Sequence, residues 1–195
     1  MTRSLLLTAQ LGFVAIGVVA GQSQSANEAL WEASRAGDTA RITAALAQGA
    51  DVNGKSRYDV TALIFASSNG RLDAVKLLVS RGADVNAQDS FYRARAAEMA
   101  LTNGHVDITL FLLQSGADAD GSLAAAVQFN NAALVNAAVA GKVTRQGLQS
   151  ALSMATAMKR EALVPPIKAA LDKLPAETGP PAFTVDAVTP DPASR

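Results

Sequence analysis

Short stretches in which apolar residues are spaced for one face of a helix recur between residues 29 and 171. Polar residues and glycines separate these stretches. The i, i+3, i+4 spacing predicts short amphipathic helices, and the succession of two stretches before each longer loop predicts that the helices come in pairs. The residues that define the first three predicted pairs are Ala29, Leu30, Ala33 with Ile42, Ala45, Leu46; Ala62, Leu63, Ala66 with Val75, Leu77, Leu78; and Ala96, Ala97, Ala100 with Ile108, Phe111, Leu112, Leu113.

Glycines mark the ends of these predicted helices at a nearly constant period. One series follows the first helix of each pair and a second series follows the second helix, and both advance by 33 and then 34 residues. Glycine is favoured at such ends because it adopts the left-handed backbone that terminates a helix. The two series are Gly37, Gly70, Gly104 and Gly49, Gly82, Gly116. A period of this length predicts a stack of repeated units.

The second unit carries the most complete motif, running from Thr61-Ala62-Leu63-Ile64-Phe65-Ala66 to Gly82-Ala83-Asp84-Val85-Asn86. In this motif the sequence resembles the ankyrin repeat, whose unit is a β-turn followed by two antiparallel helices. The family's Thr-Pro-Leu-His stretch is changed to Thr-Ala-Leu-Ile here, which removes a proline and a turn histidine but keeps a good helix former. The resemblance implies an all-α ankyrin-repeat solenoid of about four to five helix-turn-helix units over residues 27–174.

The later units are shorter than the first three. Only 7 residues separate Gly116 from Leu123, whereas 14 separate Gly49 from Leu63, so we expect the hairpin finger to be missing at that position. Two fingers are therefore expected to be complete. A fourth and a fifth helix pair, over Leu123–Ala138 and Leu148–Leu171, should close the stack, as terminal repeats do. Pro165 and Pro166 are compatible with the start of the last helix.

Charge and candidate chemistry favour binding over catalysis. Lys plus Arg equal Asp plus Glu at 17 each, so no global field attracts nucleic acid. The chain has no cysteine, and its single histidine, His105, is expected to form a hydrogen bond at the start of a second helix. Asp51, Asp84 and Asp118 recur at the repeat period, which predicts turn carboxylates that accept backbone N–H bonds. We expect no enzymatic activity, no catalytic residue, no cofactor and no metal.

Both ends of the chain differ in composition from the repeats. Residues 1–21 have the layout of a signal peptide, with Arg3 followed by an apolar run, and 22–26 would be a linker. Cleavage near Ala20 or Gly21 is expected, and an uncleaved anchor is the alternative. Residues 175–195 are rich in proline and small residues and are predicted to be a disordered tail, with a docking segment as the alternative.

Aromatic and charged residues at the tips of the two predicted fingers are the candidate protein-binding residues. They are expected to be exposed, and tyrosine and arginine commonly anchor interfaces. The alternative is that Tyr58 and Tyr92 pack against each other and only stiffen the fingers. Trp31 is expected to cover the exposed end of the stack, and partner contact is its alternative. The candidate binding residues are Arg57, Tyr58, Asp59, Phe91, Tyr92 and Arg93.

The resemblance extends to periplasmic ankyrin-repeat proteins of Gram-negative bacteria. It implies a periplasmic or secreted monomer that binds another protein through its concave face and its hairpin fingers. No nucleic acid partner is expected, and no membrane contact after signal cleavage. Two uses are implied: an accessory to a periplasmic enzyme in stress defence, or an immunity protein that blocks a secreted toxin. An enzyme of unrecognised type and a purely structural repeat are the alternatives from other classes.

Overall fold

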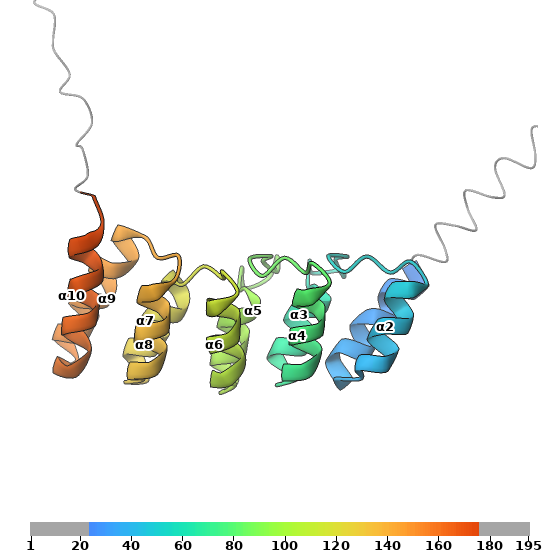
Figure 1. Cartoon of the computed structure of the whole chain (residues 1–195), viewed down its shortest axis with the longest axis horizontal. Coiled ribbons are helices and arrows are strands. Elements are labelled where there is room, and N and C mark those ends of the chain that lie inside the picture. The colour runs from blue at the N-terminus through green and yellow to red at the C-terminus, as the bar shows by residue number, and fades with distance from the viewer. Residues whose placement is uncertain (1–23, 176–195) are drawn as a thin grey trace, which may run out of the picture.

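A computed structural model of the chain describes residues 24–175, in which helices stand side by side in a single row (Figure 1). Successive antiparallel helices of the described range form five pairs. The pairs are the helix at 24–36 with α2 (Thr39–Ala47); α3 (Ala62–Ser68) with α4 (Leu72–Ser80); α5 (Ala96–Thr102) with α6 (Val106–Gln114); α7 (Asp120–Gln128) with α8 (Ala132–Ala140); and α9 (Arg145–Ala157) with α10 (Val164–Lys173), which the short 3-10 helix Glu161–Leu163 precedes. The predicted all-α repeat solenoid is confirmed.

The connections between pairs differ in length as expected. Residues 48–61, the first finger, and residues 81–95, the second finger, are long loops along the upper edge of the row in Figure 1. Between α6 and α7 only residues 115–119 remain, so no third finger forms there. Pairing of extended backbone in the described chain is limited to two isolated bridges, Gln88 with Arg95 and Asp118 with Lys142.

The ends of the chain fall partly outside the described range. The expected signal peptide, 1–21, and residues 176–195 of the expected tail lie outside it. The linker expected at 22–26 is wrong for residues 24–26, which belong to the first helix. Ala26 is buried, so the start of this helix is part of the folded domain.

Polar side chains at the N-termini explain where several helices begin. Asp38, Thr61, Asn131 and Thr144 each accept a hydrogen bond from the backbone N–H three residues later. Such a bond satisfies one of the amides that a helix leaves without an internal partner. Helix α10 begins instead with the proline pair at its first turn, as expected from the sequence.

The turn inside each pair requires a left-handed residue. Gly37, Gly70 and Gly104 supply it in the first three units, with φ between +71° and +83°. In the fourth and fifth units the same place is taken by Asn130 and Lys159, at φ +54° and +55°. The turn geometry therefore persists where the glycine does not, because the packed helices on both sides hold the backbone in place.

His105 directly precedes α6 as its N-terminal cap residue, but its side chain does not form the expected hydrogen bond at the helix start. The ring lies instead against the preceding unit, where a Cβ added at Gly70 would come within 2.6 Å of His105 Cε1. The expectation was wrong because it considered only the helix that follows the histidine, whereas the ring packs on the turn one repeat earlier.

Asparagine and aspartate side chains link one unit to the next along the finger edge. Oδ1 of Asn53 accepts the N–H of Asp84 at 2.7 Å, and Oδ1 of Asn86 accepts the N–H of Asp118 at 2.7 Å. Each aspartate in turn accepts the N–H two residues on, at 2.9 Å for Asp84 and 3.0 Å for Asp118. The structure thus confirms the turn role of the recurring aspartates and adds an asparagine contact between units.

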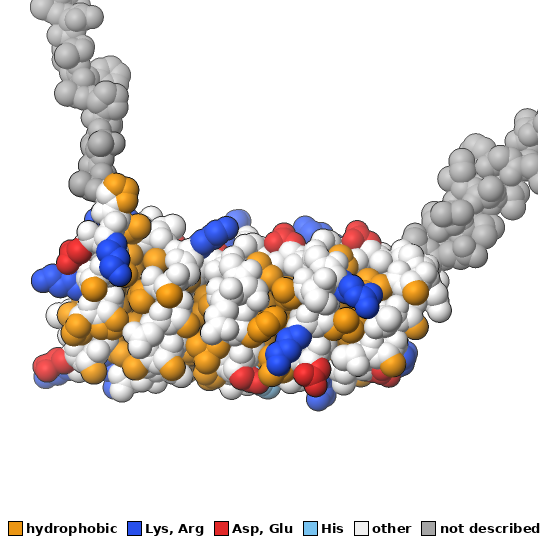
Figure 2. Space-filling view, viewed as in Figure 1, with side chains coloured by type: hydrophobic (Ala, Val, Ile, Leu, Met, Phe, Trp, Pro, Cys, Tyr) orange, Lys and Arg blue, Asp and Glu red, His pale blue; other side chains and the backbone are white. Residues whose placement is uncertain are grey.

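The core consists of small and branched apolar residues packed between the helices. One cluster is centred on the first three units and the second on the last three, and the third unit contributes to both. Figure 2 shows hydrophobic side chains in the seams between neighbouring helices, with charges of both signs scattered over the face in view. Alanine at so many core positions lets the helices approach closely, so few aromatic residues are needed inside.

Candidate functional site

The second finger is organised around a buried carboxylate. Asp89 is 5% exposed, and its Oδ1 accepts the N–H groups of Phe91 at 2.8 Å and Tyr92 at 2.6 Å. Its Oδ2 accepts the N–H of Ala94 at 3.1 Å, and its own N–H donates to the Ala94 carbonyl at 3.1 Å. A carboxylate with three amide donors holds the loop in one conformation and fixes the direction in which its aromatic side chains leave it.

The first finger is a smaller turn that contacts the second directly. The N–H of Ser56 donates to the Val60 carbonyl and the N–H of Asp59 to the Ser56 carbonyl. The N–H of Ser90 then donates across to the carbonyl of Tyr58 at 2.9 Å. The two fingers are therefore one hydrogen-bonded unit.

Three aromatic rings from the fingers form a continuous row. The ring centres of Tyr58 and Phe91 lie 6.2 Å apart, and those of Phe91 and Tyr92 lie 4.5 Å apart, both edge to face. The expected alternative of direct contact between the two tyrosines is thus replaced by contact through Phe91. Despite these contacts Tyr58, Phe91 and Tyr92 remain 51%, 66% and 73% exposed, so the rings pack on one another and still leave much of their surface open.

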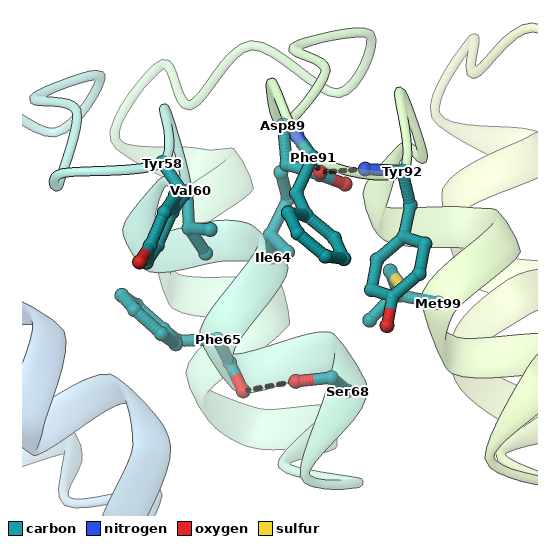
Figure 3. A pocket seen from close by; sticks show the side chains of 9 residues that line it. All are labelled: Tyr58, Val60, Ile64, Phe65, Ser68, Asp89, Phe91, Tyr92 and Met99. Carbon is teal, nitrogen blue, oxygen red and sulfur yellow. Dashed lines mark hydrogen bonds between the residues drawn. The ribbon is translucent and has the colours of Figure 1, made fainter.

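The aromatic row covers one side of a groove of about 430 Å³, here called the finger groove. Figure 3 shows the finger side chains reaching toward α3 and α5, whose residues line the other side. Its wall is mostly apolar. The lining residues are Tyr58, Val60, Ile64, Phe65, Ser68, Asp89, Phe91, Tyr92 and Met99.

The six predicted binding residues take three kinds of position in the structure. Tyr58, Phe91 and Tyr92 line the finger groove. Arg57 borders it, with its guanidinium carbon 5.6 Å from the centre of the Tyr58 ring. Asp59 and Arg93 are absent from the lining and occupy equivalent left-handed turn positions, at φ +56° and +55°.

Sequence reasoning missed the half of the groove that comes from the helices. Phe65 and Met99 occupy the same place in successive first helices, each directly before a buried alanine, and both are only partly buried. The first unit has Glu32 at this position. The apolar spacing predicts that this position faces solvent. The signal that could have identified the wall was therefore a large apolar residue at this position in two successive units. Asp89 was missed because its hydrogen bonds with the amides of its own loop cannot be predicted from helical spacing.

Trp31 forms a contact between units. Its indole N–H donates to the carbonyl of Gly54 in the first finger at 3.2 Å, and its ring is packed against the core. It therefore ties the first helix to the first finger, which differs from the expected cover over the exposed end of the stack.

Metal-ligating residues do not gather in the part of the chain that the structure describes. Among residues 24–175 no three His, Cys, Asp or Glu side chains lie together as a metal site. None of the helices in this range has both the length and the hydropathy of a membrane span.

Comparison with protein families identifies the repeats. A model for ankyrin repeats in three copies matches residues 5–89, and a model for ankyrin repeats in many copies matches residues 67–113. These repeats are ankyrin repeats. Ankyrin repeats typically form protein-interaction modules and not active sites, and this ankyrin-repeat chain has the corresponding architecture of helix pairs and fingers.

Curated relatives share the repeats but are much larger proteins. The chain is 40% identical over 67 residues to mitochondrial disaggregase of Bos taurus, which is 34% of this chain and 10% of that protein. It is 34% identical over 92 residues to the ankyrin repeat and KH domain-containing protein mask-1 of Caenorhabditis elegans, 47% of this chain and 4% of that protein. It is 32% identical over 94 residues to palmitoyltransferase ZDHHC13 of Homo sapiens, 48% of this chain and 15% of that protein. These relatives come from animals and give no support to the expected resemblance to periplasmic bacterial proteins.

Proposed function

We propose that this ankyrin-repeat chain binds a partner protein by taking a segment of it into the finger groove. The observation that carries the proposal is the row of Tyr58, Phe91 and Tyr92, which leaves more than half of each residue's surface exposed beside an apolar groove. Large aromatic side chains with access to an apolar pocket are the usual anchors of protein interfaces.

The fingers are held in place before any partner arrives. Asp89 binds three amides of its own loop, and the Ser90–Tyr58 hydrogen bond joins the two fingers. Binding therefore orders little additional backbone, and less of the interaction free energy is lost to conformational entropy. This rigidity favours a recognition surface over a loop that serves only to connect helices.

The chain is further proposed to work as a monomer in the periplasm or outside the cell after removal of residues 1–21. The support for export is the sequence of that segment, in which a charged start precedes an apolar run. Two roles are compatible with this proposal. The groove would bind a periplasmic enzyme if the chain is an accessory protein, and a toxin if the chain is an immunity protein. Mass spectrometry of the protein from a periplasmic fraction tests the export proposal, and an intact Met1 would contradict cleavage.

Substitution of the exposed rings tests binding directly. Partners are captured from a periplasmic extract on the full chain, and the affinity of a captured protein is then measured for the wild type, Phe91→Ala and Tyr92→Ala. Because exposed aromatic anchors carry much of an interface's free energy, each change should weaken binding by about tenfold or more.

Phe129→Ala is the matched control, because Phe129 is 59% exposed but lies in the turn after α7 and does not line the groove. This variant should bind as the wild type does. Undiminished binding by both groove variants would refute the proposed function. A fall in melting temperature without a change in affinity would assign the rings a structural role instead.

A further inference from the structure

Arginines border the finger groove at the end that faces the first unit. Arg35 belongs to the helix at 24–36, and its guanidinium carbon lies 4.5 Å from the centre of the Phe65 ring. Arg57 holds the corresponding position over Tyr58. Figure 3 shows Tyr58 and Phe65 on the same side of the groove, opposite Tyr92 and Met99. The groove therefore has a cationic end and an apolar end.

Both guanidinium groups keep their hydrogen-bond donors. In the described chain the only arginines that take part in the three ion pairs are Arg41 and Arg95. No hydrogen bond to another described residue from the side chain of Arg35 or Arg57 accompanies the ring contacts. A guanidinium carries five N–H donors, and a contact with a ring face does not require any of them to be used in a hydrogen bond. The ring contacts therefore leave the guanidinium N–H groups of Arg35 and Arg57 without an acceptor among the described residues, and these groups remain available to a carboxylate.

Acidic residues near the groove do not neutralise this end within the described structure. Asp89 is buried and its oxygens are occupied by three backbone amides. Glu32 pairs with Arg41 at 3.8 Å, and Asp59 takes part in none of the ion pairs. Arg35 and Arg57 are exposed and have no carboxylate partner among residues 24–175.

We infer that the partner segment is acidic next to its apolar anchor: an aliphatic or aromatic side chain enters the finger groove, and an Asp or Glu beside it meets Arg35 and Arg57. The inference rests on the proposed function and adds the chemistry and the direction of the bound segment. A basic segment would instead place like charges together at this end, which disfavours binding.

Selection from a random peptide library displayed on phage tests the inference with the full chain as bait. The enriched peptides should contain a large apolar residue with Asp or Glu at one or two neighbouring positions. A synthetic peptide of the enriched sequence is then compared with two matched probes, one with Lys in place of the acidic residues and one with Gly in place of the apolar residue. Both changes should weaken binding, and the affinity of the acidic peptide should fall as salt is raised.

Substitutions at the rim separate the charge effect from the groove itself. The double variant Arg35→Gln, Arg57→Gln should bind the acidic peptide about five- to twentyfold more weakly, since exposed pairs contribute modestly. The same variant should bind the Lys probe no more weakly than the wild type does. Arg81→Gln is the control for loss of charge, because Arg81 is exposed at the end of α4 and lies outside the groove.

The outcomes distinguish this inference from the function on which it rests. Peptides that lose affinity with Tyr92→Ala but show no preference for acidic residues, or prefer basic ones, would overturn the inference and leave the groove as a binding site. Peptides that bind without any dependence on Tyr92, or a selection that enriches nothing, would overturn both.

Discussion

Glycines with a left-handed backbone recur in this chain, and what surrounds them in space differs from one turn to the next. Gly70 and Gly82 both have positive φ, +71° and +85°, but their surroundings differ. A Cβ at Gly82 would meet nothing within 4 Å, whereas a Cβ at Gly70 would meet the ring of His105 at 2.6 Å. A side chain at Gly82 would therefore introduce backbone strain alone, whereas a side chain at Gly70 would introduce backbone strain and a clash with the ring of His105.

Alanine substitution at the two glycines measures this difference. Gly82→Ala should lower the free energy of unfolding by about 1–2 kcal/mol, the usual effect of a side chain in the left-handed region. Gly70→Ala should lower it further, because the ring of His105 has to move. Chemical denaturation of both variants checks the order. In a His105→Ala background the two losses should become equal, and an unchanged gap would rule out the ring as its cause.

At the scale of one element, the second finger depends on a single side chain. Asp89 is buried at the base of the loop and satisfies three amides that have no other acceptor among the hydrogen bonds of the described chain. The exposed rings of Phe91 and Tyr92 are directed by this loop. Asp89 therefore determines the shape of the finger groove, although it is itself almost fully buried.

Removal of the Asp89 carboxylate should loosen the finger and weaken binding. Asp89→Ala leaves buried amide donors without a partner, which should lower the free energy of unfolding by about 1–3 kcal/mol. Hydrogen exchange of the amides at 91–94 should accelerate, and binding by the groove should fall. Asp89→Asn keeps one carbonyl acceptor and should lie between the wild type and the alanine variant. Equal exchange rates in all three proteins would show that the carboxylate does not hold the loop.

The whole molecule is a linear stack in which each unit touches mainly its neighbours. The core divides into two clusters that meet in the third unit, with Leu63 in the first cluster and Leu123 in the second. In such a stack stability is the sum of local terms, so one end can open while the other remains folded. The finger groove lies between the second and third units and depends most on the first cluster.

Cavities made in the two clusters should have different consequences. Leu63→Ala and Leu123→Ala each truncate a fully buried side chain, and each should lower stability by about 2–5 kcal/mol. Hydrogen exchange should increase mainly in α3–α6 for the first variant and in α7–α10 for the second. Binding by the groove should suffer more from Leu63→Ala. Uniform acceleration along the chain in both variants would indicate a single cooperative unit.

The sequence by itself determined the elements of this protein. Apolar spacing and the two glycine series located the helix pairs, the shortened connection after Gly116 and the turn aspartates, because each follows from contacts within one unit or from its regular repetition. It also placed Tyr58, Phe91 and Tyr92 at exposed positions, since the finger tips lie outside the core pattern.

The tertiary structure alone decided how those elements meet. Three features join residues that the spacing of one helix does not relate: the groove between the fingers and α3 and α5, the carboxylate of Asp89 bound to three amides, and the contact of Arg35 with the Phe65 ring. His105 shows the same limit, because its position at the start of α6 did not reveal that its ring packs on the preceding turn. A repeat fixes its own helices through local spacing, but contacts between neighbouring units depend on three-dimensional packing, and the binding surface consists of such contacts.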